Sequence, residues 1–98
     1  MKVWVKVYRS GNTTLVAACD ENLLGKKLKF RNTILEIGEF YHGELVEVEE
    51  ALKLIEEADT ANLFGRAIVE ACIEKGIVSE EGVLEIEGIP HAQIYSIY

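Results

Sequence analysis

The side chains best suited to chemistry lie near the C-terminal end of this sequence, around Pro90. His91 and Gln93 follow this residue, the only proline in the chain. Because proline fixes its own φ angle, a turn at this point would hold the imidazole of His91 in one orientation. A fixed imidazole can act as a general base, bind a metal or donate a hydrogen bond to a phosphate. The alternative is a structural histidine that caps the helical layer or hydrogen-bonds to a backbone carbonyl.

A second polar pair, Asn62 and Arg66, interrupts an otherwise apolar segment. On a helix, residues four apart lie on the same face. Gly65 lies between them, and glycine inside a helix costs about 1 kcal/mol relative to alanine, which indicates close approach to another element or to a bound group. Packing against a sheet, with Arg66 and Glu70 as a surface ion pair, is the structural alternative. The residues predicted to form one small binding site are Asn62, Arg66, His91 and Gln93.

The other chemistry-bearing residues match no recognised catalytic or metal-binding motif. The chain has two histidines and two cysteines, and none follows a His-X-His, His-Glu-X-X-His or Cys-X-X-Cys spacing. A phosphate-binding loop, a dinucleotide-binding glycine motif and a Gly-X-Ser-X-Gly elbow are also missing. Cys19 and Cys72 lie among apolar residues, which indicates inert core thiols, with a disulfide as the alternative. We therefore predict no catalytic residue, no metal and no cofactor, and favour a binding protein over an enzyme.

Cations and aromatic rings alternate along the first segment of the chain. On a strand such alternate side chains share one face, where rings can stack on bases and cations can bind phosphates. A second cationic segment would extend this surface if its strand lay nearby. The alternative is that the rings pack beneath the helices or cover a sheet edge. The residues predicted to contact RNA are Lys2, Trp4, Lys6, Tyr8, Lys27, Lys29 and Arg31.

The charges are unevenly distributed along the chain. The net charge is −7, yet residues 1–31 have a net charge of +5 and residues 32–98 a net charge of −12. This asymmetry predicts a basic region and an acidic region on the surface of one small protein. The alternative is a charge balance that serves solubility alone.

Length and hydropathy are typical of a soluble single-domain protein. The 98 residues are enough for one domain, residues 1–98, with a modest core. No apolar run approaches the roughly 20 residues of a membrane-spanning helix. The N-terminal segment alternates and does not resemble a signal peptide. We expect a cytoplasmic protein without membrane contact.

The spacing of apolar residues predicts the secondary structure. Strands are predicted at residues 2–8, 15–19, 26–30, 34–37, 83–87 and 93–98, and helices at residues 47–58 and 60–75. Asp20 is expected to cap a helical turn at residues 21–24, and residues 88–92 are expected to form a turn. The aromatic loop at residues 38–43 is expected to fold over the edge of the core, with an exposed contact patch as the alternative.

This order of elements predicts an α+β fold. We expect a two-layer sandwich, in which a mostly antiparallel sheet carries two main helices on one face. The last predicted strand is apolar and could pair with another chain, so a homo-oligomer joined through this strand is one expectation.

The sequence resembles one known family through four short motifs that occur in order along the chain. These are Arg-Ser-Gly at residues 9–11, Val-Ala-Ala-Cys-Asp at 16–20, Ala-Asn-Leu-Phe-Gly at 61–65 and Pro-His-Ala-Gln at 90–93. The chain is similar to the archaeal domain of unknown function 424 (DUF424) family of small stand-alone proteins. The resemblance implies a cytoplasmic archaeal protein with a two-layer α/β fold, encoded among translation and ribosome-maturation genes. It implies no catalytic residue.

These observations predict a small binding protein associated with translation or ribosome maturation, which contacts RNA or a ribosomal protein. The basic strand face would make the contact, and the polar site would orient it. The alternative function is a small-ligand binder or enzyme with a pocket at the turn formed by Pro90, His91, Ala92 and Gln93. Clustering of the four polar site residues around one hollow would favour that alternative.

Overall fold

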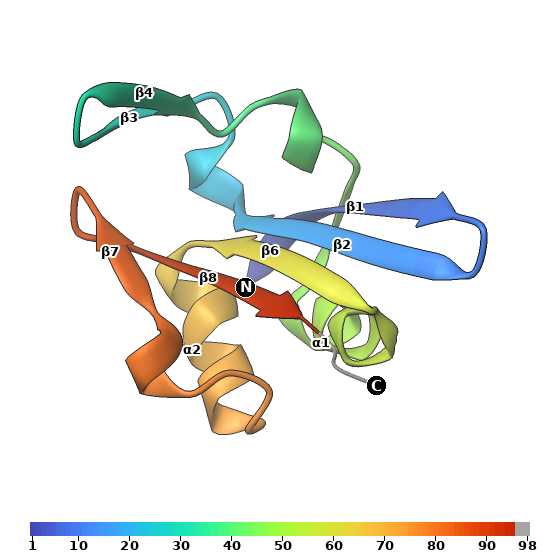
Figure 1. The fold of residues 1–98 in the computed structure, drawn as a ribbon. Helices are drawn as coiled ribbons and strands as arrows, with labels where there is room; N and C mark the ends of the chain where they lie inside the picture. The colour runs from blue at the N-terminus through green and yellow to red at the C-terminus, as the bar shows by residue number, and fades with distance from the viewer. Residues whose placement is uncertain (96–98) are drawn as a thin grey trace.

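The computed structural model describes residues 1–95, which form a six-stranded sheet with helices on one face (Figure 1). The strand order is β5-β1-β2-β6-β8-β7, and among these described strands β2 and β6 are the one parallel pair. The strands are β1 (Lys2–Ser10), β2 (Thr13–Asp20), β5 (Glu44–Glu47), β6 (Thr60–Phe64), β7 (Leu84–Ile86) and β8 (Ile89–Tyr95). The predicted α+β fold with a mostly antiparallel sheet is confirmed.

The two faces of the sheet are covered by different elements (Figure 1). Helices α1 (Val48–Glu57) and α2 (Arg66–Glu74) pack on one face, as predicted. A separate hairpin, β3 (Lys27–Phe30) with β4 (Thr33–Glu36), lies on the other face beside two short 3₁₀ turns, η1 (Glu21–Leu23) and η2 (Glu39–Tyr41). A third 3₁₀ turn, η3 (Glu80–Gly82), connects α2 to β7. None of the helices in residues 1–95 is both long and apolar enough to span a membrane.

Successive side chains of β1 pack alternately into two hydrophobic clusters, one on each face of the sheet. Val3 and Val5 point toward the helices and belong to the larger buried cluster. Trp4 and Tyr8 point the other way and pack at the margin of a second cluster beneath the hairpin and η2. Period-two alternation produces this division because successive side chains of a strand point to opposite faces.

The predicted helix at residues 60–75 is wrong in its first third. Thr60–Phe64 is the strand β6, and Gly65, with φ +118°, separates it from α2. Strand β6 lies between β2 and β8 and contributes to the buried clusters on both faces of the sheet. The strand alternates polar Thr60 and Asn62 with buried Ala61 and Leu63, but four residues are too few to distinguish this pattern from the first turn of a helix.

The predicted turn at residues 88–92 is also wrong, because Pro90 and His91 lie within strand β8. The turn consists of Glu87 and Gly88, both with positive φ, between Ile86 and Ile89. The carbonyl of Pro90 accepts a hydrogen bond from the Gly65 N–H at 2.8 Å, at the point where β6 ends. Proline is tolerated there because β6 ends at Phe64 and the Gly65 carbonyl accepts a hydrogen bond from the Val69 N–H. The missing N–H of Pro90 therefore leaves no acceptor of β6 unpaired. The predicted last strand is present as far as Tyr95, and residues 96–98 lie outside the described residues.

Candidate functional site

The four polar residues predicted to form one site lie on opposite faces of the sheet. Strand register places Asn62 beside Gln93, and His91 beside Phe64, on the face away from the helices. Arg66 is instead the first residue of α2, on the helical face. Three of the four predicted residues are therefore neighbours, and a hollow shared by all four is not formed.

Tyrosine hydroxyls bind the side-chain amides of Asn62 and Gln93 on the face of the sheet away from the helices. The Tyr41 hydroxyl donates a hydrogen bond to the Asn62 side-chain oxygen, and the Tyr95 hydroxyl donates to Gln93 Oε1 at 2.5 Å. Tyr41 is buried, and loss of solvent raises the pKa of its hydroxyl well above the ordinary value. This hydroxyl therefore stays protonated at neutral pH and acts as a fixed donor to Asn62.

His91 is held by a backbone carbonyl, the structural alternative considered from sequence. Its Nδ1 lies 2.9 Å from the Leu63 carbonyl oxygen, and its ring stacks on Phe64 with centroids 4.1 Å apart. A carbonyl only accepts, so Nδ1 carries the proton and Nε2 bears the lone pair in the neutral ring. Burial lowers the pKa of His91, and the hydrogen bond to Leu63 opposes this effect only in part. Within residues 1–95 no group of three His, Cys, Asp or Glu side chains could hold a metal ion.

The lowered pKa of His91 predicts that acid destabilises the fold. In the unfolded chain the histidine has its ordinary pKa near 6.5, so below this pH it binds a proton more readily than His91 of the folded chain does. The free energy of unfolding therefore decreases as the pH falls through 6.5. We expect the melting temperature to decline between pH 7.5 and pH 5.5, and His91→Phe to reduce this decline. Thermal unfolding followed by circular dichroism over this pH range measures both. Equal slopes for the two proteins would assign the acid sensitivity to other groups.

The predicted RNA-binding face of β1 is covered by the chain's own aromatic loop. Trp4, Lys6 and Tyr8 do share one face. The Trp4 ring meets His42 edge to face at 5.2 Å, and the Tyr8 ring stacks on Phe40 at the same centroid distance. The Tyr8 hydroxyl donates to the Phe40 carbonyl at 2.9 Å, and Lys6 Nζ reaches the carbonyl of Glu39 at 3.4 Å. The rings are partly buried against the chain's own loop, which leaves less of their surface for stacking on bases.

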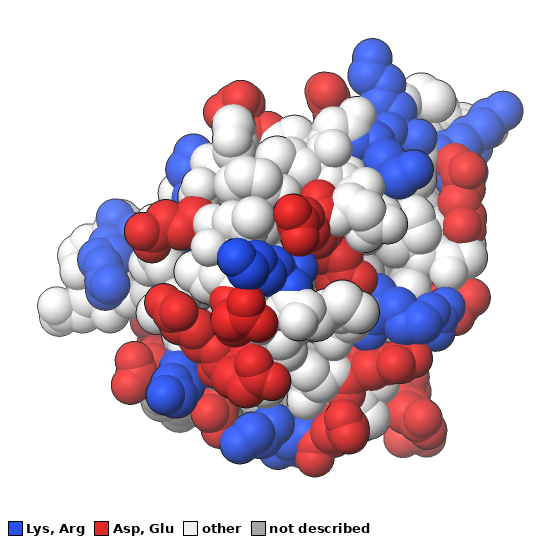
Figure 2. Space-filling view, turned by 180° about the vertical axis from the view of Figure 1, so that it is seen from behind, with Lys and Arg blue, Asp and Glu red and all other residues white. Residues whose placement is uncertain are grey.

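Two cations of the first third of the chain lie opposite carboxylates, and a third rests on an aromatic ring. Lys27 lies opposite Glu36 in the β3–β4 hairpin, and Lys2 lies opposite Glu47 across the β1–β5 pair. Arg31 rests on the ring of Phe30, 4.9 Å from its centroid. Figure 2 shows Lys and Arg side chains separated by Asp and Glu side chains on that face of the molecule. The predicted division into a basic and an acidic region is not visible on this face.

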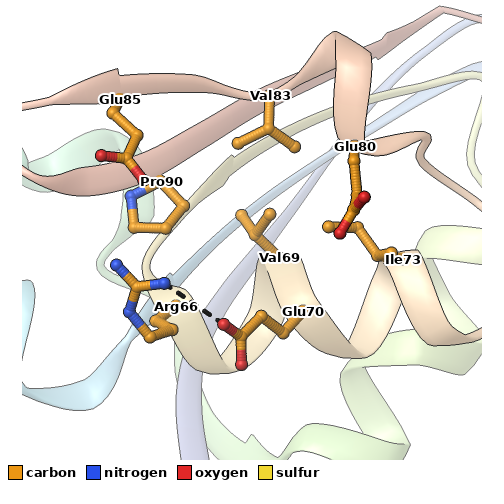
Figure 3. A pocket seen from close by; sticks show the side chains of 8 residues that line it. All are labelled: Arg66, Val69, Glu70, Ile73, Glu80, Val83, Glu85 and Pro90. Carbon is orange, nitrogen blue, oxygen red and sulfur yellow. Dashed lines mark hydrogen bonds and ion pairs between the residues drawn. The ribbon is translucent and has the colours of Figure 1, made fainter.

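An open groove that sequence reasoning missed lies between α2 and the β7–β8 hairpin (Figure 3). Its volume is about 240 Å³. Val69, Ile73 and Val83 form an apolar floor with Pro90, and in Figure 3 the two valines face each other. The charged lining residues are Arg66, Glu70, Glu80 and Glu85, and a neighbouring hollow adds Glu74. The signal in the sequence was a glutamate-rich stretch from residue 70 to residue 87 with a single lysine, but pattern alone could not show which glutamates converge.

Arg66, the cation among the lining residues described for the groove, already has hydrogen-bond partners within the chain. Arg66 Nη1 lies 3.2 Å from Glu70 Oε2, and its Nη2 donates to the Gly88 carbonyl at 3.4 Å. Glu80 and Glu85 are exposed, and Glu74 lies one turn beyond Glu70 on α2. The groove therefore has an apolar floor and an excess of negative charge at its rim.

Asp20 positions the start of α2, and with it Arg66. Its carboxylate accepts hydrogen bonds from the N–H groups of Ala67 at 2.9 Å and Ile68 at 3.1 Å. The predicted cap on η1 is wrong, because η1 has no side-chain cap. A carboxylate at a helix N-terminus satisfies free N–H groups and complements the helix dipole. Asp20 does this from strand β2, far away in the chain.

The two cysteines are separate buried thiols, as predicted. Cys19 belongs to the cluster beneath the hairpin, and Cys72 belongs to the cluster beneath the helices, so the sheet lies between them. Burial raises the pKa of Cys19 to about 12 and that of Cys72 to about 11. Neither thiol is poised for nucleophilic chemistry, which requires the thiolate.

Comparison with known proteins gives a family and a fold. The family model described as "Protein of unknown function (DUF424)" matches residues 8–97. A crystal structure of an uncharacterized conserved protein from Methanopyrus kandleri is 29% identical, covers 100% of this chain and 96% of its own, and superposes with a TM-score of 0.82. No curated protein matches the chain.

Proposed function

The chain belongs to the DUF424 family of proteins of unknown function, and from this premise we propose that it is a non-enzymatic binding protein for a basic partner protein. The observation that carries the proposal is the groove between α2 and the β7–β8 hairpin, which has an apolar floor and a glutamate-rich rim. The ligand is a lysine or arginine side chain presented by an exposed segment of the partner.

The groove fits both parts of such a side chain. Lysine and arginine have an apolar stem and a charged head, which favours surfaces where the two environments meet. The stem would lie on Val69 and Val83, and the head would reach Glu80 and Glu85. Because Arg66 is paired with Glu70, it does not neutralise these two carboxylates. The net charge of −7 would also attract a basic partner at a distance.

A protein partner agrees better with this surface than RNA does. RNA binding depends on cations that neutralise phosphates and on free rings that stack on bases. Here the rings of Trp4 and Tyr8 contact the chain's own loop. Of the two contacts expected from sequence, the proposal therefore retains a ribosomal protein with lysine- and arginine-rich segments. The two free thiols agree with a reducing compartment, which supports the cytoplasmic location that we propose.

Binding of a labelled peptide rich in lysine and arginine, followed by fluorescence anisotropy, tests the proposal. We expect the paired substitution Glu80→Gln and Glu85→Gln to weaken binding about tenfold, which corresponds to about 1.4 kcal/mol. The matched control is Glu56→Gln with Glu57→Gln at the exposed end of α1, which removes the same charge away from the groove. The control is expected to change affinity little.

Two results would contradict the proposal. Equal weakening by both pairs would show attraction to net charge and not to the groove. Filter binding of ribosomal RNA that is tighter than peptide binding would restore the RNA interpretation. Co-sedimentation with ribosomes, lost in the groove variant and kept in the control, would support the protein partner expected here.

A further inference from the structure

The two edges of the sheet differ in how they are protected against pairing with another strand. Strand β5 forms one edge, where Glu44 and Glu47 are exposed. Charged residues on an edge strand oppose pairing with further strands. At the opposite edge, β7 covers only the first part of β8, from Ile89 to His91. Strand β8 continues to Tyr95 without a further neighbour among residues 1–95.

The backbone direction of β8 shows which groups this edge presents. The Pro90 carbonyl points toward β6, since it accepts from the Gly65 N–H. Backbone groups of successive residues in a strand point to alternate sides. The N–H and C=O groups of Gln93 and Tyr95 therefore point outward, beyond the end of β7. These four groups are available to a new strand.

The side chains around this edge are uncharged and contain both a protrusion and a hollow. Tyr95 is 68% exposed and Leu84 is 45% exposed. An open hollow of about 330 Å³ lies where β7 begins, lined by Gly82, Leu84, His91, Ala92 and Gln93. The tyrosine and the hollow are only two residues apart on the same strand, so one edge carries both halves of a self-complementary contact.

We propose that β8 pairs antiparallel with β8 of a second copy of this chain. The register that uses the outward backbone groups of both Gln93 and Tyr95, beyond the end of β7, places Gln93 opposite Tyr95 of the partner subunit, with Ile94 on the two-fold axis. This register forms hydrogen bonds in both directions and joins two six-stranded sheets. It also places Tyr95 of the partner subunit beside Gln93 and over the hollow next to His91. Ile94 then meets its own counterpart on the helical face.

Charge supports a second copy as the occupant of this edge. Each chain carries a net charge of −7, but strand β8 has no Asp, Glu, Lys or Arg between Ile89 and Tyr95. Pairing of these strands therefore sets no like charges directly opposite each other, which would be destabilising. Repulsion between the rest of the two chains is screened by salt, so the dimer becomes tighter as ionic strength rises.

Sedimentation equilibrium from micromolar to millimolar protein tests the dimer. We expect twice the monomer mass for the wild type, and at least a tenfold higher dissociation constant for Tyr95→Glu. The matched control is Ile34→Glu on the β3–β4 hairpin, which also adds a carboxylate to an exposed apolar position, 61% exposed in this case. A strictly monomeric wild type, or equal loss of dimer in both variants, would overturn the proposal.

A cysteine cross-link tests the register separately. Residues in a non-hydrogen-bonded antiparallel pair have Cα atoms about 4.5 Å apart, within the range for a disulfide. Ile94→Cys should therefore form an intermolecular disulfide under mild oxidation, whereas Asn32→Cys on the distant hairpin should not. The native thiols Cys19 and Cys72 are buried and do not compete. Cross-linking at position 32 and not at position 94 would exclude the proposed pairing, whatever ligand the groove takes.

Discussion

Gly43→Ala is expected to destabilise the protein by about 3 kcal/mol, a large share of the 5–15 kcal/mol typical of a small domain. A Cβ atom at this position would collide with the carbonyl oxygen of Val5 and lie 2.9 Å from the Cα of Lys6. Both are backbone atoms of β1, so no side-chain rotation relieves the contact. The segment from η2 to Gly43 must move instead, and it carries Phe40 and His42, whose rings contact Tyr8 and Trp4.

Urea unfolding measures this cost, and near-ultraviolet circular dichroism reports whether Trp4 keeps its contact with His42. The matched control is Gly82→Ala in η3, where the nearest atom to a new Cβ is Ser79 Oγ at 3.8 Å. Surface substitutions of this kind change stability by about 0.5 kcal/mol or less. If Gly43→Ala matched this control, the aromatic loop would not be held closely against β1.

Gly65→Ala is expected to cost about 3 kcal/mol for a different reason. Gly65 has φ +118° and ψ 149°, a region almost restricted to glycine, and forcing alanine into it costs about 1–3 kcal/mol. A Cβ would also lie 2.6 Å from both carboxylate oxygens of Asp20. Displacing that carboxylate removes the cap from α2, a loss of about 1 kcal/mol. Gly76→Ala, with φ +74° and open space around it, is the control for a positive-φ glycine that has no steric contact.

A double-mutant cycle with Asp20→Ala separates the two contributions at Gly65. Asp20→Ala alone should destabilise α2, because the N–H groups of Ala67 and Ile68 lose their acceptor. In that background Gly65→Ala should cost less than in the wild type, because the carboxylate with which it collides is gone. Urea unfolding of the four proteins gives the coupling free energy. Full additivity would show that the carboxylate and the glycine are independent.

Local patterns were sufficient to predict most of the fold. Alternation at Val3 and Val5 identified β1, and spacing of three and four residues identified α1, because each pattern reports burial of one face. The assignment failed at β6, whose alternation from Thr60 to Leu63 is too short to distinguish a strand from the start of the helix that follows. It also failed at Pro90, where a two-residue turn at Glu87 and Gly88 lies just before the strand.

The candidate site was less predictable because it depends on which segments meet in space. Asn62, His91 and Gln93 were identified and do meet, across β6 and β8. Arg66 was grouped with these residues because residues 60–75 were predicted to be one helix. In the structure Gly65 separates strand β6 from helix α2, so Asn62 and Arg66 do not share a helical face. The groove combines α2 with the β7–β8 hairpin, and no spacing within either segment indicates their distance. The contact of His42 with Trp4 also joins two segments that are far apart in the sequence, so no local pattern predicts it.

The parallel pair formed by β2 and β6 constrains the order of assembly. Leu15 pairs with Thr60, so the polypeptide must close a long loop before the middle of the sheet exists. Loop closure of this kind is entropically costly and slows folding relative to hairpin formation. On a translating ribosome the β1–β2 hairpin would emerge well before β6, its neighbour in the sheet. Until β6 is made, the unpaired edge of β2 would be accessible to chaperones or to other nascent chains.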